Sequence, residues 1–314
     1  MTADVVVVGA GVAGVACARE LQVAGHDVRL LDRGHRPGGR MASRRLWDRP
    51  TDLGASYLTA SDPDFVAVVE DWADRGLAAE WTDTFCVLGE AERRTSTGPV
   101  RWGAPRGLRS LVEDLASDLE VERVDVASLA DVSASAVVLA MPDPQARRLC
   151  EGHPVAEVLT RRWEPVIALA ARWDRRTWDD VSPTGRFHGA FVNDDPTIGW
   201  IADDGRRRGD DAPVLVVHST PELAARHLDD PAGAGPGLVA ALRRQLHLEE
   251  PADVHVHRWT FARPVGERQE PYALVEGPAG PVGACGDGWG PKPKVETAWV
   301  SGTRLGRALV ERLG

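Results

Sequence analysis

Three glycines near the start of the chain have the types and spacing of a phosphate-binding turn. Gly9, Gly11 and Gly14 follow four consecutive valines in the order G-x-G-x-x-G. In such a turn the first glycine permits the tight bend, the second lets a pyrophosphate approach the backbone, and the third allows a helix to pack closely on a strand. The pyrophosphate would accept hydrogen bonds from free N–H groups at the positive end of the following helix, around Val12 and Ala13.

An acidic residue completes this motif. A helical stretch from Val12 to about Ala24 leads to a second apolar strand over residues 28–31, which ends on Asp32. A carboxylate at this position can accept hydrogen bonds from both hydroxyls of an adenosine ribose. The strand before the glycines, the helix after them and this acid together indicate a dinucleotide-binding unit. A glycine-rich turn in another kind of α/β protein is the alternative interpretation.

A second glycine-rich segment distinguishes between dinucleotides. After Arg33 the chain continues to Gly38-Gly39-Arg40-Met41. This segment resembles the second signature of the flavoprotein superfamily that includes the amine oxidases, whose members hold FAD over a Gly-Gly-Arg turn. NAD dehydrogenases lack such a turn. The resemblance therefore implies FAD rather than NAD, with Arg33, Gly39, Arg40 and Met41 among its contacts.

Hydrophobic periodicity predicts the elements that position these residues. We expect helices over 61–82 and 104–120, a β-hairpin over 83–103, and strands over 121–129 and 137–142. The chain then enters a mostly antiparallel sheet with a few helices. It returns with a strand over 280–290 and a terminal helix over 295–313.

A Gly-Asp pair before this terminal helix resembles the third FAD signature. Asp287, which follows Gly286, would bind the ribityl chain or the pyrophosphate side of FAD. The first turn of the helix, with Val295, Glu296 and Ala298, would point its positive end at the flavin N1–C2=O edge. An ordinary turn is the alternative interpretation of the Gly-Asp pair.

Two further backbone contacts with FAD are expected. Gly54 and Ala55 are small residues in a predicted extended segment, so the backbone there can approach a flat ring. In the flavoprotein pattern, the strand over 121–129 gives one N–H and C=O pair to adenine, and we assign that contact to Val126. The predicted fold class is thus α/β, with a Rossmann-type FAD-binding domain and a second, mostly antiparallel substrate domain. The FAD-binding domain would comprise residues 1–60, 100–145 and 275–314, and the substrate domain residues 61–99 and 146–274.

Composition limits the class of protein. The 314 residues favour two domains or one large one, and 43% apolar residues are ample for a core. A net charge of −10 argues against general affinity for nucleic acid or an anionic membrane. The four cysteines show no metal or redox spacing, and no apolar run has the length of a membrane span. We therefore expect a reduced, cytoplasmic protein with no metal site.

Nearly the whole chain resembles the bacterial renalase-like FAD-dependent oxidoreductases. The more specific matching segments are DLGASYLTASDPDF (52–65), HRWTFARP (257–264) and GDGWGPKPKVETAWVSG (286–302). The resemblance implies noncovalent FAD and a two-domain fold like those of the amine oxidases and p-hydroxybenzoate hydroxylase. It also implies a reaction in which a 2- or 6-dihydro isomer of NAD(P)H gives a hydride to flavin N5. Dioxygen then reoxidises the flavin, with hydrogen peroxide and NAD(P)+ as products.

Two departures from that family lie where a substrate pocket can be reshaped. The link between Val126 and Val137 is short where the family usually carries an extra β-hairpin. Glu222-Leu223 follows the HSTP segment where the family tends to have Trp-Ser. A third feature concerns the amine oxidases: the only lysines are Lys292 and Lys294, so the mid-chain lysine common in those enzymes is absent.

Candidate substrate residues are few, because hydride transfer needs mainly positioning and exclusion of water. An aromatic pair would sandwich a flat nicotinamide, and an arginine would hold a carboxamide or phosphate. For each residue alone, a core position is the alternative interpretation. The candidates are Tyr57, His218, Trp259, Arg263 and Trp289.

Three functions stay open from the sequence. The first is the renalase-like oxidase, with a reduced nicotinamide dinucleotide isomer as substrate and O2 as electron acceptor. The second is another FAD-dependent amine or small-molecule oxidoreductase of specialised metabolism. The third is a non-catalytic dinucleotide-binding protein. Bound yellow flavin and its bleaching by a particular donor would separate them.

Overall fold

The run of valines near the start of the chain forms the centre of a parallel sheet. In the computed structural model, which describes residues 3–89 and 93–314, β1 (Ala3–Val8) lies between β2 (Val28–Asp32) and β8 (Ala134–Leu139), parallel to both. The outer strands are β7 (Val121–Arg123), β14 (Ala273–Gly277) and β15 (Gly280–Ala284). The order is β14-β15-β8-β1-β2-β7, with only the β14–β15 pair antiparallel.

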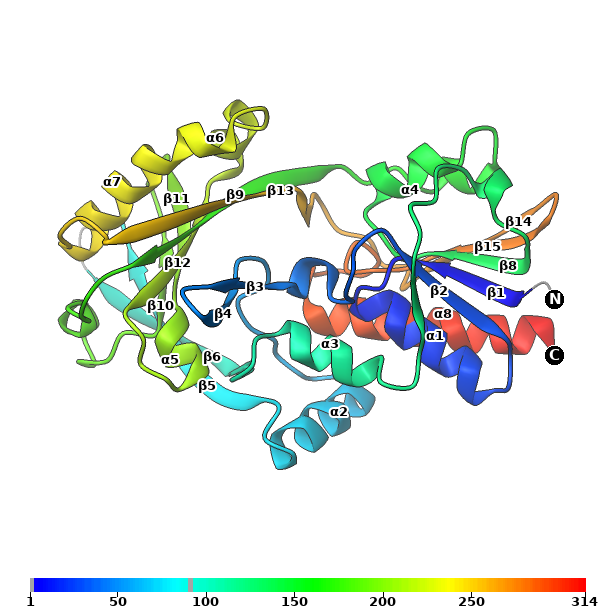
Figure 1. The fold of residues 1–314 in the computed structure, drawn as a ribbon, viewed down its shortest axis with the longest axis horizontal. Helices are drawn as coiled ribbons and strands as arrows, with labels where there is room; N and C mark the ends of the chain where they lie inside the picture. Colours follow the sequence, from blue (N-terminus) through cyan, green and yellow to red (C-terminus); the bar gives the residue numbers. More distant parts are fainter. Residues whose placement is uncertain (1–2, 90–92) are drawn as a thin grey trace.

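Helices cover both faces of this sheet (Figure 1). On one face, α1 (Val12–Val23) packs directly on α8 (Val295–Leu313). A Cβ added at Gly302 would lie 2.0 Å from the Ala13 carbonyl oxygen, so this helix pair needs a glycine at its contact. On the other face lies α4 (Asp143–Leu149). The remaining helices of this half are α2 (Pro63–Asp74) and α3 (Arg109–Leu115).

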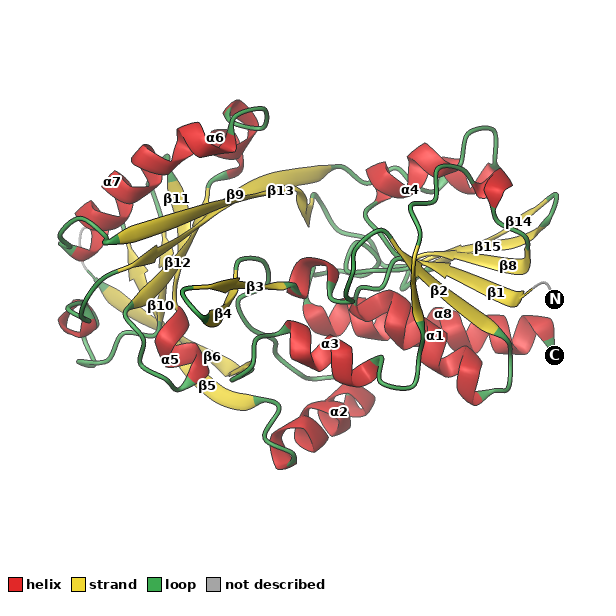
Figure 2. Cartoon of the chain, viewed as in Figure 1, coloured by secondary structure: helices red, strands yellow, loops and turns green. Residues whose placement is uncertain are grey.

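A second sheet forms the other half of the molecule (Figure 2). Its strand order is β13-β9-β12-β11-β10-β5-β6, and every neighbouring pair except β10–β5 is antiparallel. Leu238, Leu242 and Leu246 of α7 (Gly235–Leu246) pack on one face of the sheet. The strands are β5 (Ala79–Leu88), β6 (Arg94–Gly103), β9 (Trp163–Arg172), β10 (Gly189–Val192), β11 (Ile198–Asp203), β12 (Val214–Ser219) and β13 (Asp253–Pro264).

A short hairpin lies between the two halves, and two short helices pack on the second sheet. The hairpin of β3 (Ser43–Leu46) and β4 (Arg49–Asp52) leads from the first sheet toward the second. The short helix α5 (Asp204–Arg208) follows β11, and α6 (Pro221–Arg226) follows β12. Single 3-10 turns occur at Gly39–Met41, Leu129–Asp131, Pro154–Glu157, Asp179–Val181 and Pro231–Ala234.

Four elements are shorter than the periodicity predicts, and one of them is the strand expected over 280–290, which is β15 and ends at Ala284. The helix expected over 61–82 ends at Asp74, before Gly76 at φ +67°, and the chain continues into β5. The helix expected over 104–120 is limited to α3, because residues 104–108 form a turn around Gly107 at φ +88°. The strand expected over 121–129 is limited to β7, which pairs with β2 over only three residues. These limits follow from turn geometry and from the length of the partner strand.

The domain boundaries expected from the sequence stay a prediction, with one change that the packing suggests. Phe65, Val69 and Trp72 of α2 are buried in the same hydrophobic cluster as Val5 and Val7 of β1. We therefore propose that α2, which the sequence assigned to the substrate domain, belongs with the dinucleotide-binding half. The rest of residues 61–99 is mainly β5 and β6, in the second sheet.

Candidate functional site

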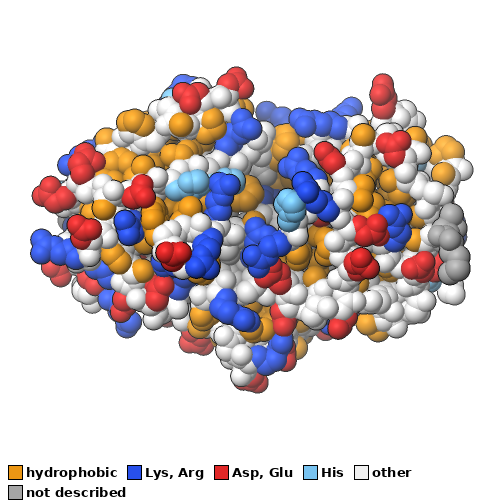
Figure 3. All heavy atoms as spheres, in the orientation of Figure 1, with side chains coloured by type: hydrophobic (Ala, Val, Ile, Leu, Met, Phe, Trp, Pro, Cys, Tyr) orange, Lys and Arg blue, Asp and Glu red, His pale blue; other side chains and the backbone are white. Residues whose placement is uncertain are grey.

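A cavity of about 1360 Å³ lies between the two sheets. It opens where β1, β8 and β15 end, and in α/β sheets ligands bind outside the carboxyl ends of the strands. The second sheet forms the opposite wall with residues of β6, β10, β11, β12 and β13. The volume exceeds the roughly 300–1,000 Å³ of ordinary ligand pockets. In Figure 3, Lys, Arg and His side chains gather around the hollow between the halves.

The glycine turn after β1 forms one end of this cavity. A Cβ at Gly9, which has φ +108°, would lie 2.6 Å from the Ala140 oxygen, and one at Gly14 would lie 1.9 Å from the Gly9 oxygen. A Cβ at Gly11 would meet no atom within 4 Å. Gly11 lines the cavity with Val12 and Ala13, at the start of α1, where no side chain caps the helix. The turn thus presents bare backbone N–H groups, as a phosphate site requires.

Asp32 lies at the end of β2 as the sequence predicts. Its carboxylate accepts hydrogen bonds from the backbone N–H groups of Ala10 (2.8 Å) and Gly34 (2.6 Å). These bonds hold the side chain beside the glycine turn. Asp32 is not among the residues that line the cavity, so its contact with a ribose stays a prediction.

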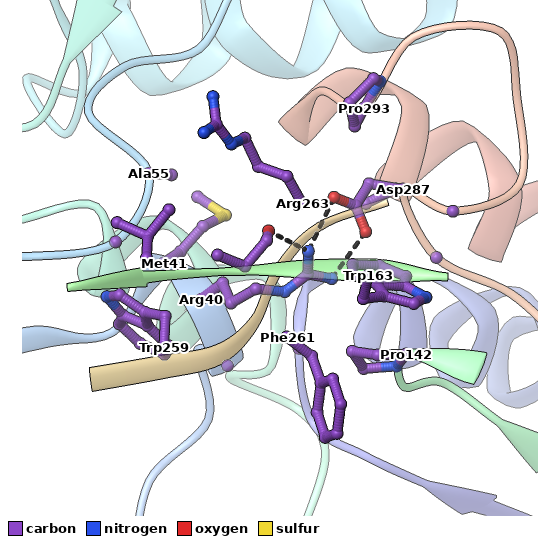
Figure 4. A pocket seen from close by; sticks show the side chains of 18 of the residues that line it. Arg40, Met41, Ala55, Pro142, Trp163, Trp259, Phe261, Arg263, Asp287 and Pro293 are labelled. Atoms are coloured by element: carbon purple, nitrogen blue, oxygen red, sulfur yellow. Dashed lines mark hydrogen bonds and ion pairs between the residues drawn. The ribbon is translucent and has the colours of Figure 1, made fainter. Parts of the chain in front are cut away.

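Two predicted cofactor residues bind each other across the cavity. Arg40 donates two hydrogen bonds to the Asp287 carboxylate, at 2.8 and 2.6 Å, and a third to the Ala262 carbonyl at 3.2 Å (Figure 4). The Arg40 guanidinium also lies 4.8 Å from the centre of the Trp163 ring. This ion pair joins the Gly-Gly-Arg turn to the Gly-Asp segment, although they are far apart in sequence.

The segment after β4 is held close to this turn. Ala55 N donates to the Arg40 carbonyl at 2.9 Å, and a Cβ at Gly54 would lie 2.0 Å from the same oxygen. The Leu53 carbonyl accepts from Trp259 Nε1 at 2.9 Å and contacts His218 Nε2 at 3.1 Å. Gly54 and Ala55 line the cavity, so the backbone is held where a flat ring could approach it.

His218 is bound to backbone and electrically neutral near pH 7. The pKa of His218 is lowered to about 4, chiefly by burial and also by nearby Arg263 and Arg207, while the bond to Leu53 opposes them. Because a carbonyl can only accept, Nε2 carries the proton and Nδ1 is left as an acceptor. His218 is thus a satisfied strand histidine, as its sequence context favours.

This lowered pKa predicts a loss of stability in mild acid. A histidine whose folded pKa is depressed binds a proton more readily in the unfolded chain, so stability falls as pH drops from 6.5 toward about 4. His218→Asn should reduce that loss by about 2 kcal/mol, allowing for its partial exposure. Urea unfolding at pH 7 and pH 4.5 would measure it. The exposed His35→Asn is the matched control, and equal losses in both variants would contradict the assignment.

Tyr57 lies in an aromatic cluster on the wall formed by the second sheet. Its ring centroid is 5.5 Å from that of Phe85, 5.9 Å from that of Trp200 and 6.2 Å from that of Trp81. Burial raises the pKa of the Tyr57 phenol, and the neighbouring Arg101 guanidinium opposes that increase. Tyr57 therefore keeps its proton near neutral pH, and the residue lines the cavity beside Arg101.

The other three substrate candidates also line the cavity. Trp259 packs edge-on against His257, with ring centroids 4.5 Å apart. Trp289 is buried, with the Arg268 guanidinium 3.8 Å from its ring centre. Figure 4 shows Arg263 extending into the cavity, and Arg263 is exposed to solvent. All five sequence candidates thus meet at one cavity, and their roles stay a proposal.

Most predicted FAD contacts lie on the same cavity wall. Those that line it are Gly11, Val12, Ala13, Arg33, Gly39, Arg40, Met41, Gly54, Ala55, Gly286, Asp287, Val295 and Ala298. At the start of α8, Lys294 is the N-cap and makes no side-chain cap bond. A second helix N-terminus therefore faces the cavity with free N–H groups, as the third signature implies.

Five predicted contacts do not line the cavity. Gly9 and Gly14 pack within the glycine turn, and Asp32 accepts a hydrogen bond from the Ala10 N–H beside it. Val126 packs against a hydrophobic cluster beyond the short β7. The Glu296 carboxylate accepts from Asp62 N at 2.7 Å and from Ser61 N and Oγ, so a contact of Glu296 with FAD stays a prediction for its backbone alone. The carboxylate holds the start of α2 against α8.

Several cavity residues were missed by the sequence interpretation. Arg101 of β6, Phe191 of β10 and Trp200 of β11 lie on the second sheet, and Trp163 and Phe261 lie nearer the Arg40–Asp287 pair. Strand alternation is the signal that could have found Arg101, because it lies between Val100 and Trp102 on the face that turns inward. Because arginine is mostly exposed in proteins, however, the residue type places Arg101 on the solvent face.

The comparisons with known proteins concern first the dinucleotide motif. A family profile described as NAD(P)-binding Rossmann-like domain matches residues 7–72. AofH of Mycobacterium tuberculosis, described as a flavin-containing monoamine oxidase, is 49% identical over 57 residues, which are 18% of this chain and 13% of that protein. Putrescine oxidase of Kocuria rosea is 37% identical over 68 residues, 22% of this chain and 14% of that protein. The chain thus matches only about an eighth of these relatives' length.

Solved structures match the whole fold. Cyclohexylamine oxidase from Brevibacterium oxydans gives a TM-score of 0.75 at 13% identity, covering 100% of both chains. Putrescine oxidase bound to putrescine gives 0.71 at 15% identity, covering 99% of this chain and 100% of that one. The fold is therefore the α/β architecture of these oxidases, a Rossmann-type domain joined to a second sheet, as the sequence predicts.

Two features are absent from the residues that the structure describes. Within residues 3–89 and 93–314, no helix combines the length and apolar character that crossing a membrane requires. The same residues contain no group of three or more His, Cys, Asp or Glu side chains placed to hold a metal ion.

Proposed function

We propose that the protein is an FAD-dependent oxidoreductase of the flavin amine oxidase superfamily that oxidises 2- or 6-dihydro isomers of NAD(P)H. The observation that carries the flavin assignment is the pair of bare helix N-termini at one cavity. The starts of α1 and α8 both line it, and neither has a side-chain cap. Such ends bind anionic groups through free N–H groups and the helix dipole.

The residues present fit FAD. The open space at Gly11 admits a pyrophosphate against the backbone, and Asp32 is held beside it for a ribose. Gly54 and Ala55 present backbone to a flat ring. We propose that this binding is noncovalent, and all four cysteines are buried and unpaired. Buried free thiols also suit a reducing compartment such as the cytoplasm. FAD, when bound, would supply a hydride acceptor that O2 regenerates with release of hydrogen peroxide.

The charge of the cavity favours an anionic substrate over a cationic amine. Two of its three acids are engaged: Asp287 with Arg40, and Asp143 with Arg268 at 3.2 Å and with Arg161 N at 3.0 Å. The third, Asp229, is exposed. The basic residues that line the cavity are Arg33, Arg40, Arg101, Arg148, Arg258, Arg263 and Lys294. A dinucleotide carries phosphates that this excess of positive charge would attract.

The chain's own part in such a reaction is positioning. Trp259 and Tyr57 provide flat apolar walls against which a nicotinamide ring can lie. Buried aromatic rings around Tyr57 exclude water from that end of the cavity. His218 is neutral and bound to Leu53, so it holds the wall and accepts no proton near neutral pH. Positioning and desolvation are the main requirements of hydride transfer.

An amine oxidase is the second candidate, and a specific observation favours it. Tyr57, Phe191 and Trp200 line the cavity as an aromatic cluster, and aromatic faces attract ammonium groups. The solved structures with this fold include oxidases named for amines. A binding protein without catalysis is the third candidate.

Anaerobic stopped-flow mixing tests these candidates. We expect 2- and 6-dihydronicotinamide dinucleotides to bleach the visible band of the purified yellow protein rapidly, and ordinary NADH or putrescine to bleach it slowly. This result follows if the cavity presents the isomeric ring to the flavin. Rapid bleaching by amines instead would assign the amine oxidase function, and no bleaching by any donor would favour the binding protein. A colourless protein that takes up no FAD would refute the flavin assignment.

A further inference from the structure

Arg101 is a buried cation without an acidic partner. The residue is only 7% exposed and lines the cavity from β6. Its Nη1 donates to the Asp83 carbonyl, and its guanidinium lies 4.5 Å from the centre of the Phe85 ring. Among the residues that the structure describes, no carboxylate lies within ion-pair distance of it. Tyr57 is its other polar neighbour.

The other buried arginines are compensated. Arg208 binds the carboxylates of Asp52 at 2.7 Å and Asp204 at 3.0 Å. Arg161 has the same 7% exposure as Arg101 and donates to the carbonyls of Val265, Gly266 and Gly288. Arg161 does not line the cavity. Arg101 thus differs from both in having a single carbonyl acceptor and an open side.

A buried charge normally needs a partner, because removal from water costs several kcal/mol that only an opposite charge or several hydrogen bonds recover. Around Arg101 the protein offers mostly aromatic faces. The open side is the cavity, where Tyr57, Phe191 and Trp200 form an apolar wall beside it. A planar ligand with an anionic group would place its ring against this apolar wall and its anionic group against Arg101.

We propose that Arg101, with the Tyr57 hydroxyl beside it, forms an anion-binding subsite that determines substrate specificity. Its ligand group is a carboxylate or a phosphate attached to a flat ring or ring-bearing molecule. Arginine binds both groups through its planar fork of N–H donors. The subsite lies on the wall formed by the second sheet, because Arg101 belongs to β6. The inference rests on the proposed function only in treating this cavity as the substrate site.

A series of probes with one benzene ring and different charges tests the subsite. Benzoate, phenyl phosphate, neutral benzamide and cationic benzylamine would be titrated into the purified FAD-loaded protein. Tryptophan fluorescence reports binding without turnover, since Trp81 and Trp200 adjoin Tyr57. We expect the anions to bind about tenfold or more tightly than benzamide, and benzylamine to bind most weakly. Preference for benzoate would point to a small carboxylate substrate, and preference for phenyl phosphate to a dinucleotide phosphate.

Variants of Arg101 connect this preference to the residue. Arg101→Met should weaken binding of the anions about tenfold or more and leave benzamide within about twofold. Arg101→Lys keeps the charge and should retain part of the preference, which covers the case in which the methionine variant does not fold. Arg172→Met is the matched control, because Arg172 also stacks on a ring, 5.7 Å from the Trp47 centroid, but lies outside the cavity.

Two outcomes would overturn the subsite. One is an unchanged affinity for both anions in the folded Arg101 variants, and the other is tightest binding of benzylamine by the unsubstituted protein. Failure of the proposed reaction is a separate result. If binding of the anions depends on Arg101 but the dihydronicotinamide isomers do not bleach the flavin, the result supports the subsite and refutes the proposed substrate.

Discussion

Gly11→Val is expected to remove bound flavin from a protein that remains folded. A Cβ at Gly11 meets no protein atom within 4 Å, and its backbone is extended at φ −76° and ψ 175°, which any residue adopts. The new side chain would instead occupy the space over the start of α1. Losing one charge-assisted hydrogen bond to an anion lowers affinity about tenfold or more. Flavin content per protein after gel filtration would measure the loss.

Two matched variants separate this effect from general damage. Gly237→Val lies on α7, where a Cβ also meets nothing, and it should keep its flavin. Gly14→Val should fail to fold, because its Cβ would lie 1.9 Å from the Gly9 oxygen. Circular dichroism and thermal melting report folding in each case. Full flavin retention by Gly11→Val would mean that the pyrophosphate binds elsewhere.

Asp204→Asn is expected to cost about 3–5 kcal/mol of folding stability, because it leaves buried guanidinium groups without their shared partner. Asp204 is fully buried at the start of α5 and binds Arg49, Arg207 and Arg208. Burial alone would raise the pKa of Asp204, but these three cations outweigh it and hold that pKa well below its usual range. Urea unfolding at pH 7 would measure the loss.

The same network positions the cavity wall. Arg207 donates to the carbonyls of Ser56 at 2.8 Å and Asp52 at 3.2 Å, on either side of Gly54 and Ala55. We therefore expect Asp204→Asn to weaken flavin retention as well as stability. Asp210→Asn is the control, since Asp210 also binds Arg49 but is largely exposed, and its loss should stay within about 1 kcal/mol. Equal losses in the two variants would contradict the network's role.

The pH dependence of this network has a definite sign. A carboxyl whose folded pKa is depressed contributes stability above its unfolded pKa of about 4 and loses that contribution as pH falls through the folded pKa. Asp204→Asn should therefore be closer in stability to the unsubstituted protein in strong acid than at neutral pH.

Local sequence was sufficient for the dinucleotide unit. The spacing of Gly9, Gly11 and Gly14 restricts backbone that is contiguous in the chain, so the strand, turn and helix form where the pattern predicts. The terminal helix likewise begins at Val295 as predicted. In these segments the residues that carry the signal are also the residues that make the contacts.

The order of residues thus determined the fold class, the glycine turn and the segments that we expect to bind a flavin. Tertiary structure alone decided the rest, because charged side chains carry no local signal of their partners. The helix α5 contains three consecutive arginines and no apolar stripe. Asp52 and Asp204 neutralise Arg207 and Arg208 in the interior, and Arg206 pairs with Asp179 and Asp211. The Glu296 carboxylate binds Ser61 and Asp62. Arg101 has the sequence context of a solvent-facing residue. It is nevertheless buried at the cavity wall, because β6 of the second sheet lies there.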